Sequence, residues 1–428
     1  MRIENILTFK MLFLLKLLII VVLAFSSPKY EAVYAPPDTL MIFPVIKHTD
    51  AAKPLYSVQI FTDYVDMQLP FQNFLIDIDA PFTWHDCIVQ WNIYPGSCPK
   101  DVLCESPVSC EDYECTDVRT SYSYQNPSCP PDSNSFTLPG WGFCSCPVNV
   151  VDPVTGTCGQ ALLNYDYITT NAACVPSSSF GSFPADVTGV VAFSNSRYAY
   201  PEYLAQAVKR SLSLCLPSST SSRGVLFFGS GPYYLPSQSN VDVRSYLSYT
   251  PLLKHPNSFG YFLGVVSIVI KKRSIIIPAD TLTKLSTIDP YTTLRSDIYN
   301  GIIRRFSRVT KRIPPAKPIA PFGLCFNTSY NGTQVGLKVP NMDFILQNGN
   351  KWTISTTNSI KQITNDVACL AFVDGGATSE PSIVIGTFQF EDNFLLFDLE
   401  NSTLGFSSSL LLKQNSCSNF NLTLTNSP

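Results

Sequence analysis

The stretch Ile383-Val384-Ile385-Gly386-Thr387-Phe388-Gln389-Phe390-Glu391-Asp392-Asn393-Phe394-Leu395-Leu396-Phe397-Asp398 has the most specific residue order in the chain. An apolar run leads to a glycine, a short polar turn follows, and a second apolar run ends at Asp398. Leu404-Gly405-Phe406 comes shortly afterwards. Short β-branched and aromatic runs bounded by turn residues are typical of buried strands. The stretch therefore predicts a strand, a glycine turn and a further strand.

The same pattern continues through most of the chain, where short apolar runs alternate with Gly, Pro, Asn and Asp. Residues 56–61 and 262–270 are predicted as pleated, largely buried strands. Helical spacing of apolar residues is confined to two short segments, Glu202 to Leu212 and Leu294 to Phe306. The sequence predicts a mainly β protein with a few short helices.

The first residues have the character of a secretory signal peptide. Arg2 and Lys10 precede an apolar stretch at 11–25, and small residues follow at 26–27. The uninterrupted apolar run is far shorter than the roughly 20 residues that cross a bilayer as a helix. We expect residues 1–26 to be removed, leaving a secreted, extracellular protein with no membrane partner.

Composition bounds the remaining classes of function. The 428 residues are 45% hydrophobic and 14% charged, with a net charge of -3, which gives no support to nucleic-acid binding. A basic run within residues 295–317 is predicted to be a solvated helix face. Its members are Arg304, Arg305, Arg308, Lys311 and Arg312.

Cysteine usage also favours an oxidising compartment. Ten of the 14 cysteines lie between Cys87 and Cys174, a region poor in long apolar runs, so we expect an insertion held together by disulfides. No metal-spaced histidine pair accompanies them, and we expect no metal and no cofactor. Four sequons are candidate glycosylation sites: Asn327, Asn331, Asn401 and Asn421.

A linker is predicted at 217–224, Pro-Ser-Ser-Thr-Ser-Ser-Arg-Gly, because it lacks residues able to anchor a core. It divides the mature chain into residues 36–216, an interlobe region at 217–240, and residues 241–428. A rough echo relates the two large parts, since an apolar approach leads into a turn at both 74–77 and 283–286.

Several further motifs, together with the opening stretch, resemble the pepsin-like aspartic protease superfamily. Within it, the chain is similar to the plant group of extracellular dermal glycoproteins, legume basic seed globulins, and inhibitors of xylanase and xyloglucan endoglucanase. The motifs lie at 224–229, 249–252, 290–292, 322–326, 372–376 and 404–411. The resemblance implies a bilobal fold of two β-barrel-like lobes with a cleft between them, a location in the apoplast or cell wall, and a monomer.

The resemblance places the first active-site turn at Asp77-Ile78-Asp79 and the second at Ser286. Aspartic proteolysis uses one carboxylate from each lobe, and the two share a proton. Asp77 keeps its acid, whereas the hydroxyl and glycine that normally follow are replaced, and Ser286 supplies no carboxylate. We expect a catalytically dead homologue in which Asp77 and Ser286 are relic positions.

Other catalytic assignments are weaker. Asp280-Thr281-Leu282 and Asp374-Gly375-Gly376 lack the context of a shifted catalytic turn, and the stretch matching the flap, 147–160, contains no tyrosine. The histidines are His48, His85 and His255, and His85 is interpreted as an ordinary turn residue rather than a catalytic base.

For function, the resemblance implies a defence protein whose rim loops bind and inhibit a secreted glycoside hydrolase. Similar cereal xylanase inhibitors place a histidine just before the final cysteine, where this chain reads Leu412-Lys413-Gln414-Asn415-Ser416-Cys417. A xyloglucan endoglucanase is therefore favoured over a xylanase, and Lys413 is a candidate contact. The alternatives are an aspartic endopeptidase with residual activity and a peptide-binding or storage protein of the seed-globulin type.

The resemblance also implies two disulfides, Cys325 with Cys369 and Cys215 with Cys417. Two cysteines exceed the number usual in the group. We assign the surplus to Cys158 and to Cys144 or Cys146, paired across a small loop over the flap.

Overall fold

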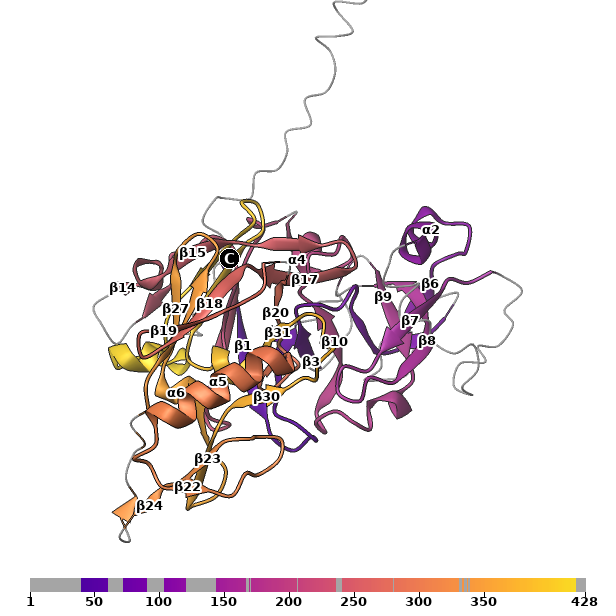
Figure 1. Ribbon diagram of the computed structural model, residues 1–428. Helices are drawn as coiled ribbons and strands as arrows, with labels where there is room; N and C mark the ends of the chain where they lie inside the picture. The colour runs from indigo at the N-terminus through magenta and orange to yellow at the C-terminus, as the bar shows by residue number, and fades with distance from the viewer. Residues whose placement is uncertain are drawn as a thin grey trace, which may run out of the picture. The chain divides into compact units, whose positions relative to one another are not determined.

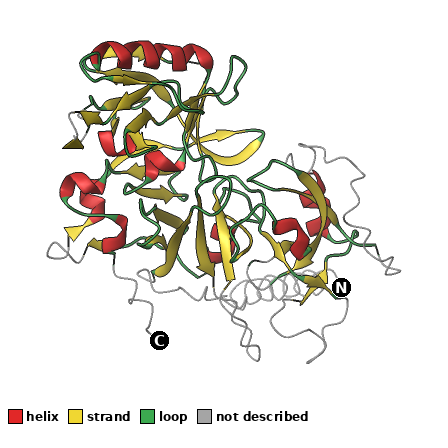
Figure 2. Ribbon diagram, turned by 90° about the horizontal axis from the view of Figure 1, so that it is seen from below, coloured by secondary structure: helices red, strands yellow, loops and turns green. Residues whose placement is uncertain are grey.

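The computed structural model describes residues 40–60, 72–90, 104–120, 144–166, 169, 171–205, 207–235, 241–279, 281–330, 333–334, 337 and 339–420. The predicted signal peptide, residues 1–26, lies outside these ranges. Strands dominate the described part, as expected from the sequence, and α5 is the longest helix drawn (Figures 1 and 2). None of the helices in these ranges is long and apolar enough to cross a membrane.

One large sheet of 15 described strands runs through the protein. In sheet order its strands are β15 (Ser248–Pro251), β33 (Thr403–Phe406), β32 (Phe394–Asp398), β11 (Ser211–Cys215), β12 (Gly224–Phe228), β1 (Met41–His48), β2 (Leu55–Ile60), β3 (Gln72–Asp77), β10 (Val187–Ala192), β4 (Trp84–Asp86), β9 (Asn171–Val175), β8 (Cys158–Tyr165), β6 (Cys104–Pro107) and β5 (Ile88–Val89), and β7 (Pro147–Val151) pairs with β8.

Smaller sheets build the rest of the second half. They are β16 (Leu253–His255), β17 (Ser258–Leu263), β20 (Thr283–Leu285), β31 (Ile383–Ile385), β21 (Thr292–Leu294) and β30 (Phe372–Asp374); then β19 (Arg273–Ile276), β18 (Val265–Ile270), β26 (Met342–Leu346) and β27 (Lys351–Ile354); then β22 (Pro315–Ala316), β23 (Cys325–Asn327), β29 (Val367–Leu370) and β28 (Ile360–Gln362). Two short pairs are β13 (Tyr234–Leu235) with β14 (Val241–Asp242), and β24 (Ser329–Tyr330) with β25 (Thr333–Gln334).

Helices are short apart from α5 (Ser296–Val309), which contacts β19 and β30 (Figure 1). The others are α2 (Tyr113–Thr120), α4 (Tyr200–Leu204), α6 (Thr356–Ser359) and α7 (Thr387–Phe390), with 3-10 turns η1 (Ser177–Phe180), η3 (Val243–Tyr246), η4 (Leu410–Lys413) and η5 (Cys417–Asn419). The apolar face of α5 is buried, while Arg304 and Arg308 are exposed, as predicted for a solvated basic face.

The two halves repeat one strand arrangement. In the first, β3 runs parallel to β10, which pairs antiparallel with β4, and β4 runs parallel to β9. In the second, β20, β31, β21 and β30 take the same four places with the same directions. The turn after β3 and the turn after β20 are therefore structurally equivalent.

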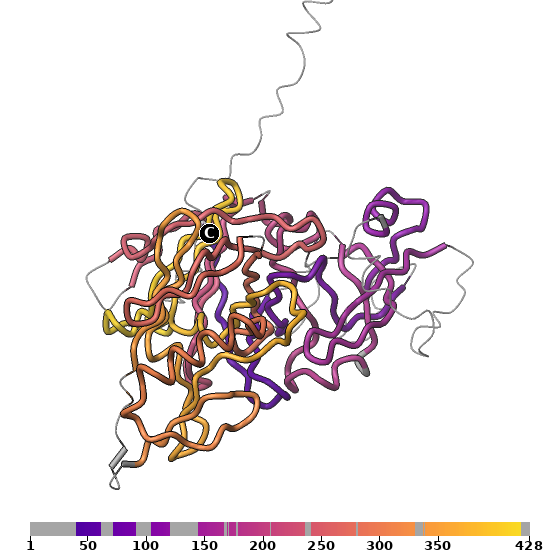
Figure 3. The backbone as a smooth tube through the Cα atoms, in the orientation of Figure 1, coloured from indigo at the N-terminus to yellow at the C-terminus, as the bar shows by residue number. Residues whose placement is uncertain are grey.

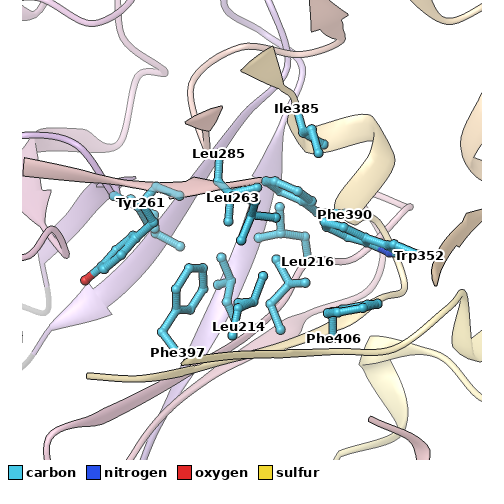
Figure 4. Close-up of a cluster of buried hydrophobic side chains, with 14 of the residues drawn as sticks. Leu214, Leu216, Tyr261, Leu263, Leu285, Trp352, Ile385, Phe390, Phe397 and Phe406 are labelled. Carbon is cyan, nitrogen blue, oxygen red and sulfur yellow. The ribbon is translucent and has the colours of Figure 1, made fainter. Parts of the chain in front are cut away.

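Strands from both ends of the chain hold the halves together. β11 pairs with β12 on one side and with β32 on the other, so the chain's last strands extend the sheet that its first strands build (Figure 3). One apolar cluster draws on both halves, with Leu214, Tyr261, Trp352 and Phe397 among its members (Figure 4). Burying a side chain of this kind stabilises the fold by about 1.5–3 kcal/mol.

Two predictions of local structure are wrong. The stretch predicted as a linker, 217–224, instead belongs to the β11–β12 hairpin: residues 216–223 connect the two strands, Gly224 begins β12, and Cys215 pairs with Val225. The predicted helix at 202–212 ends early, since α4 stops at Leu204 and β11 begins at Ser211. Of the residues whose spacing suggested a helix, Leu212 instead lies on β11, which pairs with β12 and β32. The helix predicted at 294–306 is present as α5.

Disulfides join Cys87 to Cys174, Cys110 to Cys144, Cys115 to Cys146, Cys215 to Cys417 and Cys325 to Cys369. The last two pairs are those that the resemblance implies. Pairing of Cys158 with Cys144 or Cys146 is wrong, because both of those cysteines bond to the segment around α2. The β7–β8 hairpin also keeps Cys158, opposite Val151, at the far end from Cys146.

Candidate functional site

The two equivalent turns meet at one cavity of about 680 Å³. Asp77 and Ser286 both line it, and so do aromatic, proline and charged residues from each half. Its lining includes Asp77, Asp79, Pro81, Phe82, Trp84, Asn149, Val150, Val151, Pro153, His255, Ser258, Phe259, Phe262, Lys284, Ser286, Ile288, Asp289 and Glu380. The predicted cleft is present, and its floor consists of the two turns.

In the first turn, the Asp77 carboxylate organises the backbone that follows it. Its Oδ1 accepts hydrogen bonds from the backbone N–H of Asp79 at 2.8 Å and of Ala80 at 3.2 Å. Ile78, the middle residue, is buried and apolar. This turn keeps the acid and lacks a hydroxyl.

In the second turn, Ser286 has the same local role. Its Oγ accepts from the backbone N–H of Ile288 at 3.2 Å and of Asp289 at 3.0 Å. Thr287, the middle residue, reaches across to the first turn: its Oγ1 donates to the Ile76 carbonyl at 2.6 Å and accepts from the Ile78 N–H at 3.3 Å. In both of these hydrogen bonds the second turn supplies the side chain, on Thr287, and the first turn supplies backbone groups.

Asp79 links the two halves across the cavity. Its Oδ2 forms an ion pair with the Lys284 ammonium, and its Oδ1 accepts from the Ser258 hydroxyl at 2.6 Å. A Cβ atom at Gly260 would lie 2.4 Å from Asp79 Oδ1, so glycine is needed for the carboxylate to lie against this backbone. Asp79 is the third residue of the first turn, and a small residue at this position would leave the cavity floor open. Instead, the ion pair between Asp79 and Lys284 occupies the floor.

Electrostatics at the floor follow from this arrangement. Burial, followed by the neighbouring Asp79 charge, raises the pKa of Asp77 to about 6, and hydrogen bonds and Lys284 partly oppose the rise. Burial alone would lower the pKa of Lys284, but the Asp79 carboxylate more than offsets this, and the pKa lies above its ordinary value. The pKa of Asp77 therefore lies in the mildly acidic range.

A hairpin forms one wall of the cavity, as the resemblance implies for a flap. β7 and β8 pair in register from Pro147–Leu162 to Val151–Cys158, and Asn149, Val150, Val151 and Pro153 line the cavity. Residues 147–160 contain no tyrosine. The flap's backbone is present, and the described hairpin residues 147–160 place no tyrosine at the cavity.

The two alternative aspartate turns have other surroundings. Asp374 is exposed, and its Oδ1 accepts from the Ser296 hydroxyl at the start of α5 and from the Gly376 N–H. Asp280 lies outside the described residues. Thr281, beside it, donates to the Pro278 carbonyl in a local turn.

The three histidines are dispersed. His255 lines the cavity and stacks on Phe262, with ring centroids 5.2 Å apart, while His48 contacts the Ser57 hydroxyl. Interpretation of His85 as a turn residue is wrong: it lies on β4, fully buried, and its Nε2 is 2.6 Å from Asp166 Oδ2. Pairing of β4 with both β9 and β10 explains this burial.

The candidate glycosylation sites and the candidate contact Lys413 were predicted to lie at the surface. Asn327 and Asn401 are exposed, while Asn331 and Asn421 lie outside the described residues. Lys413 is exposed at the end of η4, and its ammonium lies 5.5 Å from the ring centroid of Tyr246. Sequence reasoning missed the roles of Lys284 and Thr287. The role of Thr287 could have been found from its position, because it directly follows Ser286 in a turn that repeats the first.

Comparison with known proteins gives one consistent group. The model of the xylanase inhibitor N-terminal domain matches residues 68–230, and that of the xylanase inhibitor C-terminal domain matches residues 260–408. "Gamma conglutin 1" of Prunus dulcis is 33% identical, covering 87% of this chain and 88% of its own. "Probable aspartic proteinase GIP2" of Nicotiana benthamiana is 31% identical, with coverages of 90% and 92%.

A rice protein, "Chitinase CLP" of Oryza sativa subsp. japonica, is 30% identical and covers 88% of this chain and 90% of its own. Among solved structures, the "Crystal structure of edgp" matches with a TM-score of 0.72 and 29% identity, covering 90% of this chain and 98% of that chain. Both domain models, the relatives and the bilobal fold agree, and the chain belongs to the xylanase-inhibitor-like group of pepsin-like proteins.

Proposed function

We propose that this protein has lost aspartic proteolysis and acts by binding, as a secreted inhibitor of a cell-wall-degrading glycoside hydrolase. One observation carries the first part. Ser286 Oγ accepts from two backbone N–H groups of its turn as Asp77 Oδ1 does in the equivalent turn. Ser286 thus stands in the place of the second acid.

The chemistry explains why this substitution is decisive. A lone carboxylate cannot divide the tasks of activating water and protonating the substrate carbonyl, which the shared proton of two acids makes possible. A serine hydroxyl does not ionise in the range where carboxyls titrate. The Lys284 ammonium, paired with Asp79, also lies close enough to Asp77 to lower the pKa of that carboxyl.

The candidate binding surface is the segment Leu410–Gln414, which we term the C-terminal rim. Leu411 is 42% exposed and Leu412 is 59% exposed, and Lys413 continues the same exposed stretch. Exposed neighbouring leucines are unfavourable in water and are typical of surfaces that bind a partner. The cationic end adds a group that can pair with an acid of that partner.

The C-terminal rim is held firmly from beneath. Leu410 is buried and its N–H donates to the Asp392 carbonyl, and the Cys417 N–H donates to Asp392 Oδ1 at 2.9 Å. Cys417 is joined to Cys215 in the central sheet. A surface that is already ordered loses little entropy on docking, so a short segment can contribute substantial affinity.

The target class rests on the group to which the chain belongs. The group's domain models are described as those of a xylanase inhibitor, which favours a glycoside hydrolase as partner. The segment before the final cysteine, residues 412–416, lacks the histidine that the cereal xylanase inhibitors resembled by the chain carry there. We therefore favour a xyloglucan endoglucanase over a xylanase.

Titration of the pure, disulfide-intact protein against microbial xyloglucan endoglucanases and xylanases tests this function. We expect stoichiometric inhibition of a xyloglucan endoglucanase. The L411S/L412S variant should inhibit at least tenfold more weakly, whereas I88S, which changes an aliphatic residue of similar exposure on β5, should inhibit as the unmodified protein does. Absence of inhibition across the panel would refute the proposal.

A peptide-binding or storage role is the second candidate, and the retained cavity favours it. The cavity combines aromatic residues such as Phe259 with the charged pair Asp79–Lys284, and the "Gamma conglutin 1" likeness agrees with it. Saturable binding of peptides, lost in K284M and unaffected by L411S/L412S, together with no hydrolase inhibition, would support this role instead.

A further inference from the structure

A buried cluster of metal-ligating groups lies in the first half of the molecule, in a position separate from the cavity lining. His85 on β4, Glu105 on β6 and Asp166 after β8 place an imidazole nitrogen and two carboxylate oxygens within 4.8 Å of one another. The His85 and Asp166 side chains are 0% exposed, and Glu105 is 1% exposed. Strand pairing gathers them from distant parts of the sequence, so no sequence spacing announces the cluster.

The hydrogen bonds of His85 fix where its protons lie. Nδ1 is 3.0 Å from the backbone carbonyl oxygen of Asp86. A carbonyl oxygen only accepts, so Nδ1 carries the proton and the neutral ring presents a lone pair at Nε2. That lone pair lies 2.6 Å from Asp166 Oδ2, itself an acceptor. A positive centre, either a proton or a metal ion, must lie between them.

Glu105 gives stronger evidence that a positive centre is needed in this cluster. Both of its carboxylate oxygens are buried, and neither has a hydrogen-bond partner among the described residues. A buried carboxylate without a partner costs several kcal/mol, and such groups in proteins are paired, neutralised or bound to a metal. With two carboxylates and one imidazole, the cluster is short of positive charge.

We propose that His85, Glu105 and Asp166 bind one divalent transition-metal ion of the Zn²⁺ class. One imidazole and two carboxylates form a ligand set that such ions accept, whereas Ca²⁺ and Mg²⁺ prefer oxygen ligands alone. The bond from Nδ1–H to the Asp86 carbonyl orients the ring for ligation through Nε2, as outer partners of metal-binding histidines do.

Loading requires little rearrangement. Two ligands at about 2.1 Å from one tetrahedral ion lie about 3.4 Å apart, so the Nε2–Oδ2 pair must open by under about 1 Å. The ion displaces any proton held between these ligands and releases it to solvent. It would cross-link β4, β6 and the end of β8, beside the Cys87–Cys174 disulfide, and so act as a structural centre.

The test uses the full, disulfide-intact chain after treatment with a chelator. Calorimetric titration with ZnCl₂ at pH 7 should show one ion bound per chain and release of protons. Titration with CoCl₂ should give a visible absorption spectrum typical of Co²⁺ with an imidazole nitrogen among its ligands. CaCl₂ should not compete with zinc for the site. Zinc should also raise the thermal unfolding midpoint.

Variants distinguish this cluster from surface sites. E105Q keeps the side-chain shape and removes the unpaired charge, so it should fold and bind zinc at least tenfold more weakly; H85N should abolish the cobalt spectrum. H48N is the matched control, because His48 also lies near two carboxylates, Asp50 at 3.9 Å and Asp186 at 3.6 Å. Its binding should be unchanged.

The proposal is overturned if the natively folded protein binds no zinc, or if E105Q binds it as tightly as the unmodified chain. Loss of binding in H48N with retention in E105Q would also overturn it. Should H85N fail to fold, E105Q alone decides. The outcome is independent of hydrolase inhibition, because neither the C-terminal rim nor the cavity lining includes a proposed ligand.

Discussion

The turns at Asp77-Ile78-Asp79 and Ser286-Thr287-Ile288 occupy equivalent places in the two halves, yet each keeps what the other lacks. The first retains the carboxylate and has an apolar middle residue. The second retains the middle hydroxyl, on Thr287, and has no carboxylate. Both first residues still accept two backbone N–H bonds, so the shape of each turn survives.

This difference separates structural demands from chemical ones. Among the described residues, Thr287 alone provides the hydrogen bonds that join the turns, and it bonds to both Ile76 and Ile78. One hydroxyl is enough to hydrogen-bond the two turns, whereas one carboxylate is not enough for shared-proton catalysis. The hydrogen bonds between the turns therefore do not depend on a second carboxylate.

The largest effect is expected when the missing acid is restored. S286D should be about 3 kcal/mol less stable than S286N at pH 7, because two carboxylates facing one cavity raise one pKa by about two units. The difference should shrink towards pH 4, where one proton can be shared. Chemical denaturation at both pH values measures it, and equal stability of the two variants would mean that the turns do not face each other.

The second-largest effect on stability is expected when the hydrogen bonds from Thr287 to the first turn are removed. T287V should lower the free energy of unfolding by about 2 kcal/mol, because the buried Ile76 carbonyl loses its partner. T281V is the control, since Thr281 bonds only within its own turn and loses less. Urea unfolding compares them; an equal loss in both would show that the interlobe bond has no special weight.

Asp77 should give the protein a pH-dependent loss of stability. Its pKa of about 6 in the folded state exceeds its ordinary value of 3.8, so the unfolded chain releases the proton first, and stability falls as the pH rises from about 4 to 6. A shift of this size corresponds to roughly 3 kcal/mol, and because Asp77 is only partly buried and faces the cavity, solvent screening reduces the decline to about 1.5 kcal/mol. D77N should lack it, and an unchanged profile in D77N would assign the titration to another group.

The smallest effects should be opposite in sign. K284M removes a cation that lowers the pKa of Asp77, and D79N removes an anion that raises it. We expect shifts of about half a unit upward in K284M and downward in D79N. Carboxyl NMR titration resolves both. Shifts in the same direction would contradict the proposed ion-pair geometry.

Much of this arrangement could be predicted from the sequence, because it depends on local patterns. Short β-branched runs gave the β character, and the family motifs placed Asp77, Ser286 and a tyrosine-free flap. The prediction of a linker at 217–224 also failed for a local reason. A hairpin loop and a linker both lack core residues, so composition alone does not distinguish them. At 202–212, apolar spacing could not foresee two strand partners for β11.

Charge pairing was beyond the reach of sequence patterns. Asp79 and Lys284 lie 205 residues apart, and His85 and Asp166 lie 81 apart. No periodicity links such positions, since only the paired sheets bring them together. His85 consequently looked like a turn residue beside Trp84, when it is a fully buried residue of β4 whose partner, Asp166, follows β8.

The central claim is that this cleft binds and does not cut. Incubation of the pure protein with a denatured protein substrate between pH 3 and 5, with and without pepstatin, tests it most directly. We predict no cleavage above the level of D77N. Pepstatin-sensitive cleavage that disappears in D77N would contradict the account.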